Sequence, residues 1–147
     1  MDEGPRFFTL EEANALLPAL RLALGDVARL RSELERAIVD VGGAEIAARV
    51  LQRGERAPRG KEAEGARLLA VAEQVTDAVE RVNAMGCVLK DADAGLVDFY
   101  ALKDDEPVFL CWQLGEPVVA HWHSLEGGFA SREQIEGVEI ERPRLVN

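Results

Sequence analysis

The residue types that could support chemistry are concentrated between Gly86 and Arg132. Both histidines, both cysteines, both tryptophans and the single tyrosine of the 147-residue chain lie in this stretch. None of these residue types occurs among the first 85 positions. We therefore place any functional site within residues 86–132.

Two histidines form the sharpest pattern in this segment. His121 and His123 occupy alternate positions of a predicted strand, so their imidazoles project from the same face. Neutral imidazole is a common metal ligand, and a carboxylate from Glu116 or Asp98 would complete a mixed nitrogen and oxygen site. The pattern predicts a divalent metal, Zn, Fe or Mn, with an activated water able to hydrolyse a substrate. The alternative interpretation is a half-buried sheet face on which both histidines make only structural hydrogen bonds.

Asp98 stands in an otherwise apolar strand, LVDFY. A carboxylate buried there must be paired or face a cavity, because desolvating it without a partner is costly. Lys90, Arg132 or a histidine would serve as the partner. Asp98 is thus either part of a structural hydrogen bond or an acid with a perturbed pKa in a cleft.

Arg132 and Trp112 are the candidate substrate-binding residues. Arg132 would face a carboxylate or phosphate, and Trp112 would either stack on a planar ligand or fill the core of a small sheet. Cys87 and Cys111 lack CxxC spacing and are expected to be free, buried thiols. The sequence contains no Walker A, GxGxxG or GxSxG motif, so it supports neither nucleotide binding nor a serine hydrolase.

The first half of the chain must supply the scaffold. Thr9 and Glu12 form a capping box that starts a helix. Apolar residues then recur at alternating spacings of three and four, with Arg31 as the one polar interruption: Leu10, Ala13, Leu17, Leu20, Leu24, Val27, Leu34, Ile38 and Val41. This heptad pattern predicts one long helix packed against a partner helix, kinked near Pro18.

A second heptad helix is predicted from about residue 62 to 85, ending at Gly86. Residues 44–52 form a short helix, and residues 53–62 form an exposed loop. The two long helices make an antiparallel hairpin that cannot cover both of its own faces. We therefore expect a homodimer through the helices. Arg31 would be costly in a purely intramolecular seam unless it is paired, whereas at a symmetric interface it could meet an acid of the partner subunit.

After Gly86 the hydrophobic period changes towards two, which is typical of strands. Strands are predicted at residues 87–90, 95–100, 107–112 and 118–123, with a tail over residues 133–147. The fold class is therefore α+β: a long antiparallel helical hairpin with a kinked first helix, followed by a small antiparallel β-meander. We expect one domain, residues 1–147.

The net charge of the chain limits the classes of partner that it is expected to bind. The formal net charge is −10 at pH 7, which disfavours nucleic acid and anionic membrane as partners, since both carry negative charge. No apolar run reaches the length of a membrane-spanning helix, and the N-terminus lacks a secretory signal. We expect a cytoplasmic protein.

Ordered sequence blocks along nearly the whole chain resemble a known family. They are FTLEEAN with LLP near the start, then Gly86 with LKD, GLVDF, LCW with GE, WH, and GF with Arg132. Together they resemble the bacterial domain-of-unknown-function family 2203. The resemblance implies a small bacterial cytosolic protein of two long helices and a C-terminal sheet, without an assigned activity. It also favours His123, Glu116 and Asp98 over His121, because relatives often carry an aromatic residue at that position.

Two functions from different classes follow. In the first, the C-terminal sheet holds a divalent metal through His123, Glu116, Asp98 and His121. In the second, the protein is a non-catalytic, homo-oligomeric helical scaffold whose polar cluster is structural.

Overall fold

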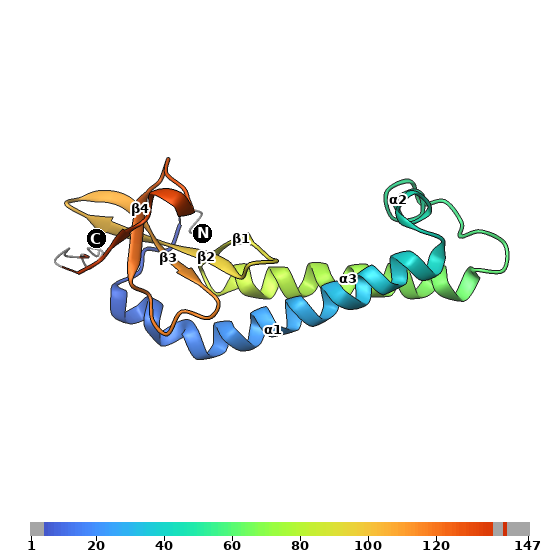
Figure 1. Cartoon of the computed structure of the whole chain (residues 1–147), viewed down its shortest axis with the longest axis horizontal. Helices are drawn as coiled ribbons and strands as arrows, with labels where there is room; N and C mark the ends of the chain where they lie inside the picture. Colours follow the sequence, from blue (N-terminus) through green and yellow to red (C-terminus); the bar gives the residue numbers. More distant parts are fainter. Residues whose placement is uncertain (1–4, 137–139, 141–147) are drawn as a thin grey trace, which may run out of the picture. The chain divides into compact units, whose positions relative to one another are not determined.

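The computed structural model describes residues 5–136 and residue 140. The chain divides into two compact units. One combines Met1–Leu24 with Arg81–Asn147, and the other is Gly25–Glu80. In the described part of the chain, three α-helices precede a five-stranded antiparallel sheet, which confirms the predicted α+β class (Figure 1).

The helices are α1 (Leu10–Val41), α2 (Ala44–Arg53) and α3 (Glu62–Ala84). The predicted capping box starts α1, because the Glu12 amide donates to Thr9 Oγ1 at 3.0 Å and the Thr9 amide donates to Glu12 Oε1 at 2.9 Å. Pro18 lies inside α1, and the helix continues through it. Residues 54–61 link α2 to α3, close to the predicted loop.

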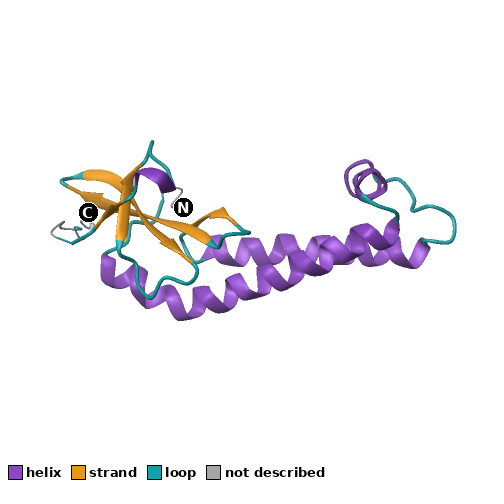
Figure 2. Cartoon of the chain, viewed as in Figure 1, coloured by secondary structure: helices purple, strands orange, loops and turns teal. Residues whose placement is uncertain are grey.

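The unit Gly25–Glu80 consists of helices and loops (Figure 2), and segments of all three helices share an apolar core. Its buried members are Ala37, Val41, Ala47, Val50 and Leu68. The placement of Arg31 in the heptad seam was wrong. Leu30, one position earlier, is the buried residue at 5% exposure, and Arg31 lies beside the seam and is half-buried. The spacing Val27, Leu30, Leu34 keeps the three-and-four pattern apolar, so no charge interrupts it.

In the other unit, the strands lie in the order β1-β2-β3-β4-β5, and all neighbours are antiparallel. They are β1 (Val88–Asp91), β2 (Leu96–Lys103), β3 (Glu106–Gln113), β4 (His121–Ser124) and β5 (Glu133–Gln134). The turn between β2 and β3 consists of Asp104 and Asp105, with φ values of 53° and 64°. Two positive φ values in succession are the geometry of a two-residue hairpin turn.

Several strand boundaries differ from the prediction, and β2 continues to Lys103 instead of ending at residue 100. Strand β4 begins at His121 and not at residue 118, because the Val119 amide donates to Asn14 Oδ1 of α1 at 2.8 Å. Residues Glu133–Gln134, predicted as tail, pair with β4 as β5. The remainder of the predicted tail at 137–139 and 141–147 lies outside the described residues.

The start of α1 lies against one face of the sheet, where the guanidinium of Arg21 is 5.8 Å from the centroid of the Trp112 ring. This face carries Val97 and Phe99 of β2 and Leu110 and Trp112 of β3, all fully buried. Phe8 meets Phe99 edge-on, with ring centroids 5.1 Å apart. Burial of these large apolar side chains supplies the main driving force for this unit. The opposite face carries Asp98, Cys111 and His123.

None of the described helices has an apolar stretch that could span a membrane.

Candidate metal site

The sheet register gathers polar side chains on the face opposite Phe99. Asp98 of β2 pairs with Cys111 of β3, which pairs in turn with His121 of β4. Directly opposed residues in adjacent strands project to the same side, and His123 projects there too because it is two residues after His121. Three of these side chains are closed off from solvent: Asp98 is 2% exposed, Cys111 0% and His123 4%.

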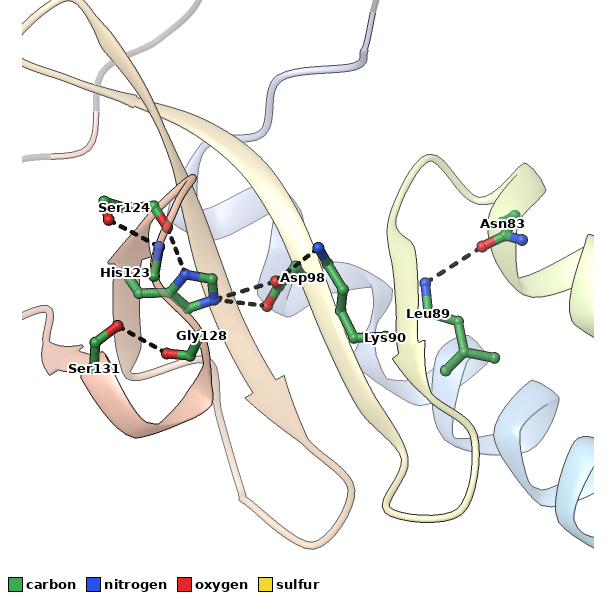
Figure 3. A network of polar contacts seen from close by, with 9 residues as sticks. Asn83, Leu89, Lys90, Asp98, His123, Ser124, Gly128 and Ser131 are labelled. Atoms are coloured by element: carbon green, nitrogen blue, oxygen red, sulfur yellow. Dashed lines mark hydrogen bonds and ion pairs between the residues drawn. The ribbon is translucent and has the colours of Figure 1, made fainter.

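The imidazole of His123 lies between two oxygen acceptors (Figure 3). Its Nδ1 is 2.7 Å from the carbonyl oxygen of Ser124, and its Nε2 is 3.1 Å and 3.3 Å from the two carboxylate oxygens of Asp98. A carbonyl oxygen only accepts hydrogen bonds, so Nδ1 carries a proton that it donates to Ser124. In the neutral ring, Nε2 would then turn a lone pair towards the carboxylate. The contact therefore requires one cation between Nε2 and Asp98, either a shared proton or a metal ion.

Lys90 borders this pair from β1. Its Nζ lies 3.8 Å from Asp98 Oδ2 and 4.5 Å above the Phe109 ring. Burial raises the pKa of Asp98, and the opposing effects of His123 and Lys90 do not cancel that rise. The carboxyl group therefore holds a proton more readily than an exposed aspartate does.

Cys111 brings a third donor to the pair. One candidate ligand atom from each of Asp98, Cys111 and His123 lies within 4.8 Å of the others. Burial raises the pKa of the Cys111 thiol to about 11, although the guanidinium of Arg132 opposes the rise. Arg132 Nη1 lies 3.7 Å from the sulfur. Without a metal, the thiol is therefore neutral and a poor nucleophile at neutral pH.

Glu116 and Arg132 form an ion pair beside the cluster. Arg132 donates to both carboxylate oxygens of Glu116, at 3.2 Å for the Nη1–Oε1 contact. The backbone amide of Gln113 also donates to Glu116, at 2.8 Å. Burial alone would raise the pKa of Glu116, but the hydrogen bonds from Arg132 and Gln113 outweigh it and lower that pKa. Arg132 also lies over the Phe129 ring at 4.2 Å, so several contacts fix its position.

Comparison with known proteins settles the family. The family model described as an uncharacterized conserved protein, DUF2203, matches residues 6–135. The chain belongs to the DUF2203 family. Comparison with curated proteins and with solved structures finds no significant match. The family resemblance predicted from the sequence blocks is thereby confirmed, and the family description names no reaction or ligand.

The DUF2203 fold brings together only part of the ligand set predicted from the sequence. Asp98 and His123 meet, whereas Glu116 contacts Arg132 and lies outside the three-donor cluster. His121 also lies outside that cluster, although it projects from the same face. Its Nδ1 is buried and has no hydrogen-bond partner among the described residues.

The two predicted substrate-binding residues are both engaged within this DUF2203 chain. Trp112 is fully buried on the opposite face and donates its indole N–H to the Glu116 carbonyl at 3.0 Å. Trp112 is therefore part of the core of the sheet, and its ring has no exposed surface. Arg132 is bound by Glu116, so an incoming anion would have to compete with an internal carboxylate.

Sequence reasoning did not include Cys111 among the ligands. Both cysteines were expected only as free, buried thiols because they lack CxxC spacing. The signal in the sequence that could have identified Cys111 as a candidate ligand is the alternation of side chains between the two faces of the sheet along β2 and β3. Once Asp98 is paired with Cys111 across the strands, the two side chains must share a face.

Proposed function

We propose that this DUF2203 protein binds a divalent transition metal through Asp98, Cys111 and His123. The ligand atoms would be a carboxylate oxygen, the thiolate sulfur and Nε2. The observation that carries the proposal is the hydrogen bond from His123 Nδ1–H to the Ser124 carbonyl. Metal-bound histidines commonly donate their second ring nitrogen in this way, which fixes the tautomer and leaves the other nitrogen as the ligand.

The donor set favours zinc within the predicted group of metals. A nitrogen, an oxygen and a sulfur donor form a mixed set that Zn²⁺ accepts, and Fe²⁺ is the second candidate. Mn²⁺ prefers oxygen donors, so a thiolate ligand counts against it. A metal ion in this site would take the place of the proton between Nε2 and the Asp98 carboxylate.

The exchange of protons for metal is balanced in charge. Without metal, Asp98 and His123 share one proton and the Cys111 thiol carries another. A divalent ion would replace both protons, leaving a carboxylate, a thiolate and a neutral imidazole around two positive charges. The buried site therefore keeps the same net charge in both states, and the loaded state does not add an uncompensated buried charge.

The burial of the donors bears on what the ion would do. All three side chains are between 0 and 4% exposed. This favours a structural or storage role over the hydrolysis that the sequence suggested, because hydrolysis needs substrate access to an open coordination position. The proposal is therefore metal binding, without a reaction.

The test is metal content after purification of tag-free protein without chelator, followed by reconstitution with Zn²⁺, Fe²⁺ and Mn²⁺ separately. We expect close to one zinc per chain in the wild type and in Glu116→Gln, and a large loss in Cys111→Ser and Asp98→Asn. Cys87→Ser is the matched thiol control, since Cys87 is also free and buried but lies outside the cluster. Thermal unfolding of each variant identifies those that fail to fold.

Substitution with Co²⁺ tests independently whether the Cys111 sulfur is a metal ligand. Co²⁺ bound to a thiolate shows a sulfur-to-metal charge-transfer band, which should be present in Cys87→Ser and absent in Cys111→Ser. Wild-type protein that remains metal-free after every reconstitution would refute the proposal. Retention of metal by Cys111→Ser with loss in Glu116→Gln would favour the ligand set predicted from the sequence.

We also propose self-association through the helices, the second function predicted from the sequence. It is supported by large apolar side chains on the helical surface: Val39 of α1 is 72% exposed and Leu69 of α3 is 51% exposed. Sedimentation equilibrium should show a dimer that dissociates at higher concentration in Val39→Glu and Leu69→Glu than in the wild type. A wild-type chain that is monomeric at high micromolar concentration would rule out this role.

A further inference from the structure

A cleft on the sheet-containing unit has none of the three proposed metal ligands in its lining. It has a volume of about 560 Å³ and lies between the β2–β3 hairpin and the end of β4. This volume is within the range of small-ligand sites. Trp122, Val108 and Leu125 line it with apolar surface, and Leu125 is 43% exposed.

A cation already occupies the aromatic surface of this cleft. The Nζ of Lys103 lies 4.9 Å from the centroid of the Trp122 ring, which is cation–π geometry. Lys103 forms its ion pair with Asp104 at 3.2 Å, and the Asp104 side chain is 86% exposed. An ion pair to so exposed a carboxylate contributes little, because water screens it. An incoming cation could therefore displace Lys103 from the indole at small cost.

Carboxylates surround the same opening. Asp104, Glu106 and Glu126 all line the cleft, so with Lys103 its formal charge is −2. Asp104 and its neighbour Asp105 both adopt positive φ. Asn-Gly and Asp-Gly are the usual pairs in such a turn, so Asp105 stands where glycine is usual and is tolerated there at some energetic cost. The hairpin thus presents acidic side chains at its tip even where glycine would fit the backbone better.

We propose that this cleft binds a basic side chain, lysine or arginine, presented by a partner protein. The cation would take the place of the Lys103 ammonium on the Trp122 ring, within reach of Glu106 and Glu126. Apolar residues beside it in the partner would contact Val108 and Leu125. The remaining cleft volume is larger than one alkyl-ammonium chain fills, which favours a peptide segment over a small free cation.

The test uses three peptides with the sequence acetyl-Gly-Leu-X-Leu-Gly-amide, where X is lysine, arginine or acetyl-lysine. Binding to the full chain is followed through the two tryptophan indole N–H signals in ¹H–¹⁵N spectra, with Trp122 assigned from Trp122→Phe. We expect the lysine and arginine peptides to move the Trp122 signal and leave Trp112 unmoved. The uncharged acetyl-lysine peptide should bind at least about tenfold more weakly.

Variants separate a defined cleft from general attraction to an acidic protein. Trp122→Leu should weaken binding about tenfold, and Trp122→Phe should weaken it less. Lys103→Met should strengthen binding about threefold, because it removes the internal competitor. Lys61→Met makes the same change of charge at an exposed site elsewhere and should have little effect.

A second pair of variants tests the carboxylates. Glu106→Gln/Glu126→Gln should weaken binding more than Glu73→Gln/Glu80→Gln, which removes the same charge from the exposed surface of α3. Three outcomes would overturn the proposal: absence of binding at millimolar peptide, equal binding by wild type and Trp122→Leu, and equal effects of Lys103→Met and Lys61→Met. Spermidine that binds as tightly as the lysine peptide would likewise reject a protein partner in favour of a free polyamine.

Discussion

Zinc binding by the Asp98–Cys111–His123 cluster should release about two protons per ion near pH 7. One is the proton shared by His123 Nε2 and Asp98, which the contacts at 3.1 and 3.3 Å require once Nδ1–H is committed to Ser124. The other is the Cys111 thiol proton, since the pKa of this thiol is raised to about 11 by burial. Protons thus compete with the ion, so affinity should fall as the pH falls, by about 100-fold per pH unit.

Calorimetric titration with Zn²⁺ at one pH, in buffers of different ionisation enthalpy, counts the protons directly. In Asp98→Asn the amide can donate to Nε2 without a shared proton, so any remaining binding should release about one proton. Glu116→Gln should release the same number as the wild type, because Glu116 lies outside the cluster. A wild-type release near zero, or an affinity independent of pH, would refute the proposed exchange.

Three further predictions concern stability and reactivity. Glu116→Gln should flatten the pH dependence of the unfolding free energy below pH 4.5. In the folded protein, the hydrogen bonds from Arg132 lower the pKa of Glu116 against the effect of burial. The stabilisation that ionised Glu116 provides is therefore present above pH 4.5 and is lost as the pH falls through the pKa of Glu116 in the folded state. Urea unfolding measures this, and an unchanged acid limb would contradict it. Cys87 and Cys111 should react with iodoacetamide at about pH 8 far more slowly in the native protein than in urea, because burial raises both pKa values to about 11; equal rates would be inconsistent with buried thiols. Thr9→Ala should cost about 1 kcal/mol of unfolding free energy through loss of the helix cap, and no change in the urea midpoint would show that the cap is dispensable.

Local signals in the sequence were sufficient for the scaffold. The capping box at Thr9 and the apolar seam of α1 each act over a few residues, and both appear in the fold. Strand β2 forms where an apolar run predicted it, although buried residues follow one another along it and do not alternate with exposed ones. The error at Arg31 arose because Leu30 and Arg31 both satisfy a spacing of three or four from Val27. When the helical spacing fits both an apolar and a charged residue, the apolar residue is the one that becomes buried, so the seam should be continued through the apolar residue.

The composition of the site depends on contacts between residues far apart in sequence. Asp98, Cys111 and His123 meet because the register of β2, β3 and β4 aligns them. The spacing of residues within one strand gives no information about that register. Glu116 looked suitable as a ligand because it is close to His121 in sequence. It belongs instead with Arg132, which approaches from the segment between η1 (Phe129–Ser131) and β5.

Replacing both members of the Asp98–His123 pair separates an architectural role from metal binding. Removing one partner leaves a buried polar group unmatched and should cost about 3–5 kcal/mol of unfolding free energy. Asp98→Leu/His123→Leu should cost much less than the sum of the single changes, because apolar residues replace a buried pair at little net cost. Zinc at about 100 times its dissociation constant should then raise the unfolding free energy of the wild type by about 2.7 kcal/mol and leave the double variant unchanged. An equal gain in both proteins would place the ion elsewhere on the chain. No gain in the wild type, together with non-additive single changes, would identify the pair as a buried structural contact.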